Sequence, residues 1–282
     1  MLGESSSWPL RPIHDGKPLP SDHVEFVFED PAAPVHDRVV SDVFHPRVFA
    51  YTPTSPNGCA ALVLAGGGYT KLVVGKEGVE VAEWLASLGF HAFVLVHRFP
   101  CARFGPRAPF EDAAEAMRQI RDRAAEFGVD PHAVGVCGLS SGGHLAACLA
   151  TVHADEGQHP DFMIIGYAPI STNATGRTIV PDKPPLPPPE KQALYEAMQP
   201  DVQMTRDPPP TFIVYAANDS VVPVENAYRL HQAIRTMGGN AELHIFADAP
   251  HGFALREPSL PVGAWPKLCA SWFEREFDSR RC

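Results

Sequence analysis

Short apolar runs recur along the chain, separated by longer segments that mix apolar and polar residues. Each run is five or six residues long. Several of them are rich in β-branched residues, which is typical of buried parallel strands. The runs are 60–65 (AALVLA), 92–96 (AFVLV), 133–137 (AVGVC), 162–167 (FMIIGY), 212–216 (FIVYA) and 241–246 (AELHIF).

The segments between these runs have the spacing of amphipathic helices. In residues 110–127 apolar side chains recur every three or four positions, and in 77–88 Val81, Leu85 and Leu88 do the same. This spacing places the apolar side chains on one face of a helix. Alternation of strands and helices predicts an α/β fold with a mostly parallel central sheet and helices on both faces.

Three segments depart from this alternation. Residues 1 to about 35 are rich in Pro and Gly and are expected to form an irregular arm. The extended segments 37–44 and 46–53 suit antiparallel strands at a sheet edge. Residues 171–210, which we call the insert, contain the run PDKPPLPPPE and predict a short helix at 189–198 between polyproline segments. The insert is expected to cap the carboxyl edge of the sheet, with a plain surface loop as the alternative.

Composition limits the function classes. The chain has 282 residues, 45% of them hydrophobic, and a net charge of −10 without a basic block, which argues against nucleic-acid binding. No signal peptide and no membrane-spanning run are visible, so a chain that begins at Met1 is expected to be cytoplasmic. Six scattered cysteines favour reduced thiols. A homo-oligomer stays an open expectation.

A candidate nucleophile lies directly after the run at 133–137. In the sequence GLSSG, the frame Gly138–Gly142 places Ser140 at the apex of a strand–turn–helix "nucleophile elbow". The frame shifted by one residue lacks the leading glycine. Ser141 is expected to offer its backbone N–H to a developing oxyanion, its side chain being only a small residue. The alternative for Ser140 is a helix N-cap.

A serine nucleophile needs a base and an orienting acid. Asp219 follows the run at 212–216, and His251 follows the run at 241–246, so all three residues lie just past predicted strands. The chain order Ser, Asp, His matches the order in α/β-hydrolases. Asp248 is an alternative acid nearer to His251, and Asp219 could instead be a simple turn residue.

The sequence LAGGGYTKL follows the first buried run. The expected second oxyanion donors are the backbone N–H groups of Gly67 and Gly68, with that of Tyr69 as an alternative. Two charged positions are expected to be structural. Arg98 is expected to pair with Asp112 to brace the elbow. Glu77 stands near a helix start, where an acid suits the helix dipole, and has no expected catalytic role.

With these pieces, the chain resembles the α/β-hydrolase esterases related to acetylxylan esterases, the "GGGY" branch near hormone-sensitive-lipase-like carboxylesterases. The matching segments include LAGGGYTKL, GVCGLSSGGHLAA, PPPTFIVYAANDSVVPVEN and ELHIFADAPHGFAL, and they run from about residue 35 to the C-terminus. The resemblance implies one α/β-hydrolase domain over residues 1–282, a Ser140–Asp219–His251 triad, and an oxyanion hole formed by Gly67, Gly68 and Ser141.

The expected activity is hydrolysis of short acyl esters, with O-acetyl groups on sugars or xylo-oligosaccharides as candidate substrates. No cofactor or metal is expected, because no His or Cys cluster has ligand spacing. The alternatives are a serine peptidase of the prolyl-oligopeptidase type, a lactonase or thioesterase, and a non-catalytic binding protein on a hydrolase fold. The expected partner is a small-molecule ester.

Overall fold

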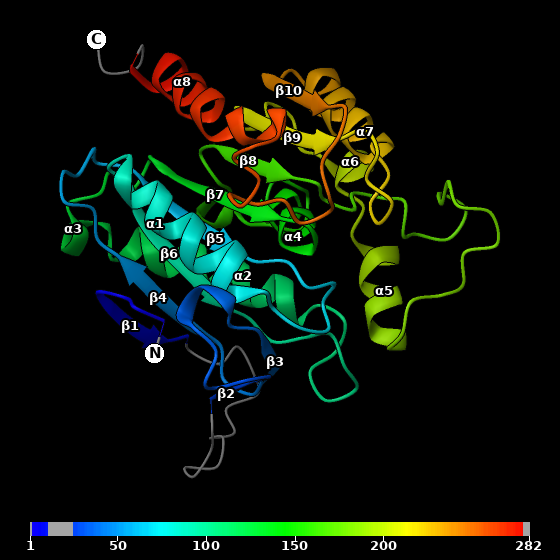
Figure 1. The fold of residues 1–282 in the computed structure, drawn as a ribbon, viewed down its shortest axis with the longest axis horizontal. Coiled ribbons are helices and arrows are strands. Elements are labelled where there is room, and N and C mark those ends of the chain that lie inside the picture. The colour runs from blue at the N-terminus through cyan, green and yellow to red at the C-terminus, as the bar shows by residue number, and fades with distance from the viewer. Residues whose placement is uncertain (1, 11–24, 279–282) are drawn as a thin grey trace.

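The computed structural model describes residues 2–10 and 25–278. Eight strands form one twisted sheet in the order β1-β4-β6-β5-β7-β8-β9-β10 (Figure 1). From β6 to β10 neighbouring strands are parallel, whereas β4 is antiparallel to both β6 and β1. The strands are Ser6–Pro9 (β1), Arg47–Tyr51 (β4), Ala60–Leu64 (β5), His91–Val96 (β6), Val134–Leu139 (β7), Met163–Gly166 (β8), Thr211–Ala216 (β9) and Ala241–Phe246 (β10).

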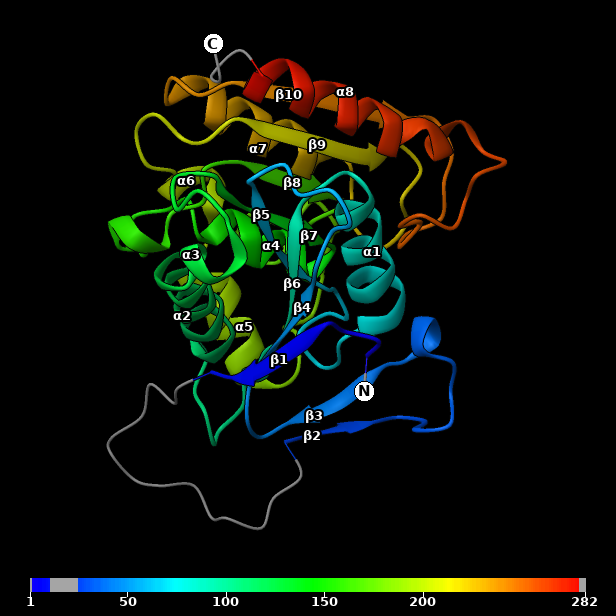
Figure 2. The same ribbon diagram turned by 90° about the vertical axis from the view of Figure 1, so that its left-hand side faces the viewer.

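Helices cover both faces of the sheet, as the sequence pattern predicts. Figure 2 shows α1 and α8 on one side, with α2, α4 and α7 on the other. The helices are Glu80–Ser87 (α1), Ala108–Asp122 (α2), Ala124–Phe127 (α3), Ser141–Cys148 (α4), Pro189–Ala197 (α5), Pro200–Gln203 (α6), Glu225–Thr236 (α7) and Trp265–Asp278 (α8). All six predicted apolar runs are strands, and the helices predicted at 110–127 and 189–198 are α2–α3 and α5.

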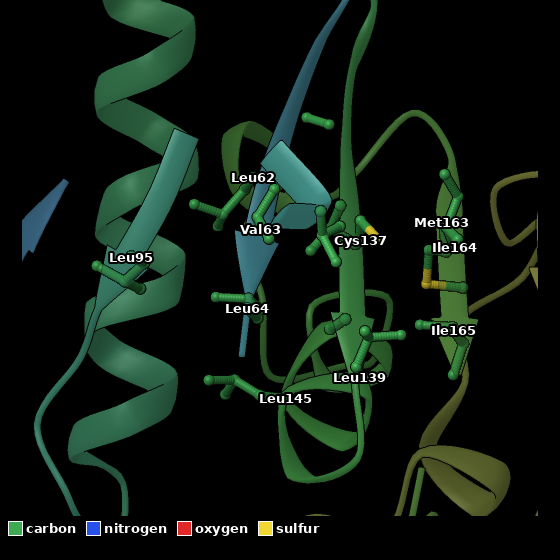
Figure 3. Packing of buried hydrophobic residues seen from close by; sticks show 14 of the residues in the cluster. Leu62, Val63, Leu64, Leu95, Cys137, Leu139, Leu145, Met163, Ile164 and Ile165 are labelled. Atoms are coloured by element: carbon green, nitrogen blue, oxygen red, sulfur yellow. The ribbon is translucent and has the colours of Figure 1, made fainter. Parts of the chain in front are cut away.

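The core lies between the central strands and the helices that cover them. Every residue of β5, β6, β7, β8 and β9 is buried, because these strands have helices on both faces. Figure 3 shows side chains of neighbouring strands packing side by side, such as Val63, Cys137 and Ile164, which are paired in register. Cys137 is thus a buried structural thiol, and the five described cysteines are all free. Cys282 lies outside the described residues.

The N-terminal region differs from the expectation of an irregular arm. Ser6–Pro9 forms β1 at the edge of the main sheet, and Trp8 packs against Phe93 and Phe127. This short strand carries no alternating apolar pattern, so periodicity alone could not reveal it. Residues 11–24 of the predicted arm lie outside the described residues.

The two extended segments at 37–44 and 46–53 do not pair with each other. Val40–Val43 (β3) pairs with Phe26–Phe28 (β2) in a separate two-stranded sheet, whereas β4 joins the main sheet. Both segments form antiparallel strands as expected, but they belong to different sheets, and β4 lies one strand in from the edge with β1 outside it. β4 pairs with β6 along its edge, and β2 provides the partner that β3 needs.

Arg98 and Asp112 form the predicted ion pair. Arg98 follows β6, and its guanidinium contacts both carboxylate oxygens of Asp112 on α2 at 2.6–3.1 Å, while its backbone N–H donates to the same carboxylate at 2.8 Å. Both side chains are buried. Burial raises the pKa of Asp112, and the contacts with Arg98 oppose that rise. The pair fixes the loop after β6 against α2.

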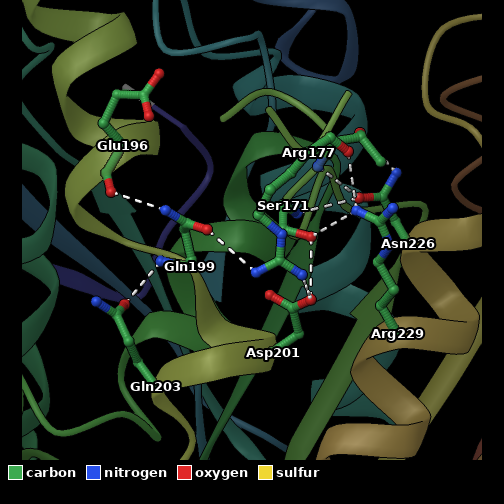
Figure 4. Close-up of polar contacts among 9 residues, drawn as sticks. Ser171, Arg177, Glu196, Gln199, Asp201, Gln203, Asn226 and Arg229 are labelled. Atoms are coloured by element: carbon green, nitrogen blue, oxygen red, sulfur yellow. Dashed lines mark hydrogen bonds and ion pairs between the residues drawn. The ribbon is translucent and has the colours of Figure 1, made fainter. Parts of the chain in front are cut away.

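The insert is anchored through hydrogen bonds that Figure 4 shows. Arg177 forms an ion pair with Asp201, whose carboxylate also accepts a hydrogen bond from Ser171 at 3.1 Å. From α7, Arg229 donates to the Ser171 hydroxyl and to the Arg177 carbonyl at 3.2 and 3.0 Å. Asn226 accepts the Ser171 N–H at 3.2 Å. Both ends of the insert are therefore tied to each other and to α7.

The middle of the insert docks through α5 onto the helix that follows the elbow. His144 of α4 is fully buried and donates from Nε2 to the Met198 carbonyl at 3.0 Å, while Nδ1 accepts from the Tyr69 hydroxyl at 2.7 Å. The Tyr195 ring of α5 lies 4.8 Å from the His144 ring and 5.6 Å from the Tyr69 ring. This contact places α5 against the carboxyl edge of the sheet.

We expect stability to fall in mild acid because of two buried histidines. Burial lowers the pKa of His144 and of His97 to about 4 in the folded protein. An exposed histidine titrates near about 6.5. Between these values only the unfolded chain takes up the protons, so stability is lost as pH falls from about 6.5 to 4. The loss is on the order of 1.4 kcal/mol per pKa unit for each histidine.

Urea unfolding at pH 7.5, 6 and 5 measures this dependence. His144→Gln should flatten the dependence of the free energy of unfolding on pH, whereas the exposed His132→Gln should leave it as in the wild type. The explanation is wrong if both variants keep the full dependence.

Candidate active site

The nucleophile elbow depends on close approach between backbones. β7 ends at Leu139 and α4 begins at Ser141, which leaves Ser140 between them with φ 52° and ψ −126°. A Cβ atom on Gly142 would lie 2.0 Å from the Leu64 carbonyl oxygen, and one on Gly138 would lie 2.3 Å from the Gly142 carbonyl oxygen. Both positions therefore require glycine. The Ser140 N–H donates to the Gly166 carbonyl at 2.9 Å, which ties the turn to β8.

The side chain of Ser140 faces a histidine and does not cap the helix. It makes no capping hydrogen bond to α4, so the N-cap alternative does not describe it. Its Oγ lies 3.0 Å from Nε2 of His251. The structure thus brings together two residues 111 positions apart, with Ser140 at the apex of the predicted frame.

Asp219 is the carboxylate that contacts His251. Its Oδ2 lies 2.7 Å from Nδ1 of His251, and its Oδ1 accepts the N–H groups of Val221 and Val222 at 2.8 Å each. Asp219 therefore stabilises its turn through Oδ1 and contacts His251 through Oδ2. Asp248 instead accepts a hydrogen bond from Asn218 at 2.5 Å.

These partners determine the proton positions on His251. Because a carboxylate only accepts, Nδ1 carries the proton, and Nε2 is left to accept the Ser140 hydroxyl proton. The Asp219 side chain is fully buried, while that of His251 is 19% exposed. The Asp219 carboxylate therefore contacts the imidazole in a region that bulk water does not reach.

The hydroxyl of Ser141 has a role that the sequence reasoning did not assign. Its Oγ accepts the backbone N–H of Gly68 at 2.9 Å, so the side chain is more than a small residue. The bond joins the glycine loop, residues 66–71, to the elbow. The backbone N–H groups of Gly67 and Ser141 make no hydrogen bond with any described residue. These two donors are available to a ligand, whereas that of Gly68 is engaged.

Glu77 also departs from its expected role. It lies in a π-helical turn, Gly75–Val79, that leads into α1, and its side chain is buried. Oε2 accepts the Gly66 N–H at 2.8 Å, and Oε1 accepts the Tyr167 hydroxyl at 3.0 Å. The carboxylate thus acts on the glycine loop instead of on the helix dipole. The signal was in the sequence, since Glu77 precedes the apolar residues Val81 and Leu85 by four and eight positions.

The same carboxylate connects the glycine loop to the histidine. The Tyr167 ring packs against the His251 ring with centroids 5.1 Å apart. Burial raises the pKa of Glu77, and hydrogen bonds from Gly66 and Tyr167 oppose that rise. A Cβ atom on Gly66 would lie 2.6 Å from both Glu77 Oε2 and the Ser140 Cβ atom. Loop, carboxylate and nucleophile therefore occupy one tightly filled region.

Two further findings concern the part of the chain that the structure describes. It contains no group of three or more His, Cys, Asp or Glu side chains placed to hold a metal ion. None of its helices is both long and apolar enough to cross a membrane.

Curated relatives match most of this chain. An acetylxylan esterase from Xylanibacter ruminicola is 30% identical over 227 residues, covering 76% of this chain and 45% of that protein. An endo-1,4-beta-xylanase B from Butyrivibrio fibrisolvens is 30% identical over 231 residues, covering 75% of this chain and 35% of that protein. The chain thus spans less than half the length of these two relatives.

A solved structure matches over nearly the whole chain. The acetyl ester-xyloside bifunctional hydrolase from Caldicellulosiruptor lactoaceticus is 31% identical, with a TM-score of 0.72 and 96% of each chain covered. The family described as having the alpha/beta hydrolase fold matches residues 96–255, which include the elbow, Asp219 and His251. This match, together with the strand order of the chain, shows that the chain belongs to the α/β-hydrolase fold family.

Proposed function

We propose that this protein is a serine carboxylesterase that hydrolyses short-chain acyl esters. The observation that carries the proposal is the continuous chain of contacts from Ser140 Oγ through His251 to Asp219, with separations of 3.0 and 2.7 Å. A hydroxyl, an imidazole with a free acceptor nitrogen and a buried carboxylate in this order form an activated nucleophile.

In the first half of the reaction, Ser140 Oγ attacks the ester carbonyl carbon while His251 Nε2 takes its proton. The carbonyl oxygen becomes negative and is stabilised by the free N–H groups of Gly67 and Ser141. The C–O bond to the alcohol then breaks, and His251 returns the proton to the leaving oxygen. The product is an alcohol and an acyl group on Ser140.

In the second half, water attacks the acyl carbon while His251 accepts one of its protons. The tetrahedral species collapses, the bond to Ser140 Oγ breaks, and His251 gives the proton back to the serine. Asp219 keeps its charge throughout and stabilises the imidazolium that forms twice. The carboxylic acid leaves, and the enzyme is regenerated.

An acetyl group on a sugar is the substrate that we favour. One similar protein is named an acetylxylan esterase, and another is named an acetyl ester-xyloside bifunctional hydrolase. The anchored insert places α5 against the glycine loop, where Tyr195 packs on Tyr69. Because hydrogen bonds hold the insert at both ends, we expect it to limit the length of acyl group that the site accepts.

Substitution of the two elbow serines should have unequal effects. Ser140→Ala should lower kcat by roughly 10⁶-fold, because the nucleophile is lost. Ser141→Ala keeps its backbone donor but removes the acceptor of the Gly68 N–H, so we expect a loss of about fivefold to tenfold. The measurement is kcat on p-nitrophenyl acetate. Mass spectrometry after a phosphonate probe should find the label on Ser140, and equal losses in both variants would contradict the assignment.

Asp219→Asn should lower kcat by about 10³–10⁴-fold while the fold remains intact, because an amide cannot stabilise the imidazolium or hold its tautomer. The matched control is Asp248→Asn, which should keep the wild-type rate. If Asp248→Asn were the impaired variant, the acid would be Asp248.

Glu77→Gln should lower kcat by about tenfold, because one of its two acceptor oxygens becomes an amide and the charge near His251 disappears. Glu83→Gln, on the exposed side of α1, is the control and should retain full activity. Thermal unfolding of both variants separates a loss of loop geometry from a loss of folding. If the Glu77→Gln enzyme were fully active, the Glu77 carboxylate would not be needed for catalysis.

A series of p-nitrophenyl esters with acyl chains of two to twelve carbons tests whether the site limits acyl length. Each methylene that cannot be buried forfeits roughly 0.8 kcal/mol of binding. We therefore expect kcat/KM to be highest for acetyl and propionyl esters and to fall steeply before octanoyl. Shortening the insert within residues 181–188 should broaden the range. An optimum at eight carbons or more, or turnover of amides in preference to esters, would argue for a different activity.

A further inference from the structure

A lysine of the insert reaches the glycine loop. Lys191 lies in the first turn of α5, and its Nζ is 3.6 Å from the position that a Cβ atom on Gly68 would take. Gly68 is hydrogen-bonded to Ser141, the neighbour of Ser140. Lys191 precedes Tyr195 by four residues, so both occupy the α5 face that packs on the loop. The ammonium therefore lies beside Gly68 of the glycine loop.

A second lysine is held close to the first. Lys183 donates to the Asn173 side-chain oxygen, and the Asn173 carbonyl accepts from Gln192 Nε2 at 3.0 Å. Gln192 also accepts the Leu186 N–H at 3.0 Å. These bonds hold the segment that carries Lys183 against the first turn of α5. Burial lowers the pKa of Lys191, and repulsion from Lys183 lowers it further.

The Lys191 ammonium has no anionic partner within residues 2–10 and 25–278. No ion pair or hydrogen bond to its Nζ is present there, and the nearby Glu196 accepts hydrogen bonds from Thr175 and Gln192 instead. Burial lowers the pKa of both lysines. Partial burial removes water from both ammonium groups, and no carboxylate of the described residues pairs with either, so an anionic ligand would offset the desolvation cost.

We propose that Lys191, supported by Lys183, binds an anionic group on the alcohol part of the ester substrate. The inference rests on the proposed esterase function and narrows its substrate class. A short acyl group such as acetyl is uncharged, so the anion belongs to the other side of the ester bond. The substrate class is an O-acetylated alcohol that carries a carboxylate, as an acetylated acidic sugar does.

A matched pair of acetyl esters tests this preference. The anionic substrate is 4-acetoxybenzoate and the neutral one is methyl 4-acetoxybenzoate, which share the acyl group and the ring. Lys191→Met should lower the kcat/KM for the anionic ester relative to that for the neutral ester by about fivefold or more. Lys183→Met should lower this anionic-to-neutral ratio less. Lys267→Met on α8 removes one exposed charge and should leave the ratio unchanged. Added salt should lower the wild-type ratio.

Two kinetic outcomes would overturn the proposal. An unchanged ratio in Lys191→Met would show that the ammonium does not contact the anionic group. An equal loss on both esters would show that it acts on the developing oxyanion, which both substrates form.

A binding experiment separates this inference from the proposed function. Calorimetric titration of the Ser140→Ala protein with 4-acetoxybenzoate needs no turnover. Binding that weakens at least fivefold on adding Lys191→Met supports the lysine site even if the wild type hydrolyses neither ester. Hydrolysis of the neutral ester, together with anion binding that is indifferent to Lys191, would keep the esterase and reject the lysine site.

Discussion

The whole site depends on how closely the backbone of the elbow packs against the neighbouring strand. Ser140 is held with φ 52° and ψ −126°, a conformation that costs a non-glycine residue on the order of 1–3 kcal/mol. The approach of Gly142 to the Leu64 carbonyl and the hydrogen bond from Ser140 to Gly166 hold that geometry. Packing of the core between β5, β7 and α4 offsets the free-energy cost of the strained turn. The serine hydroxyl is thereby presented at the sheet edge before any substrate arrives.

Glu77 extends this preorganisation from the elbow to the loops around it. Through Gly66 it fixes the glycine loop, and through Tyr167 it reaches the ring that packs on His251. A buried carboxylate satisfied by two donors is rigid, because moving it would leave both donors unpaired. The glycine loop and the ring that packs on His251 therefore share one supporting group.

Local patterns in the sequence predicted the central strands, the α2–α3 and α5 helices and the strand ends that carry Ser140, Asp219 and His251. Those features arise from apolar periodicity and from the topology of parallel sheets, which brings strand ends to one edge. The sequence did not predict β1, the partner of β3, the Ser141 hydroxyl contact or the Glu77 contact. Each of these depends on side chains or backbones from segments that meet only after folding. Gly68 and Ser141, for example, are 73 positions apart.

The division between sheet and insert also bears on how the protein can evolve. Ser140 and Asp219 follow β7 and β9, two fully buried strands in which few substitutions can be tolerated. Lys183 and Lys191 extend from a segment that is tied to the rest by the hydrogen bonds at its two ends and by one three-ring contact. Replacements in this segment can alter the charge presented to an alcohol group without disturbing β5 to β9. Natural variation or directed evolution can therefore explore new substrates at little cost in folding stability.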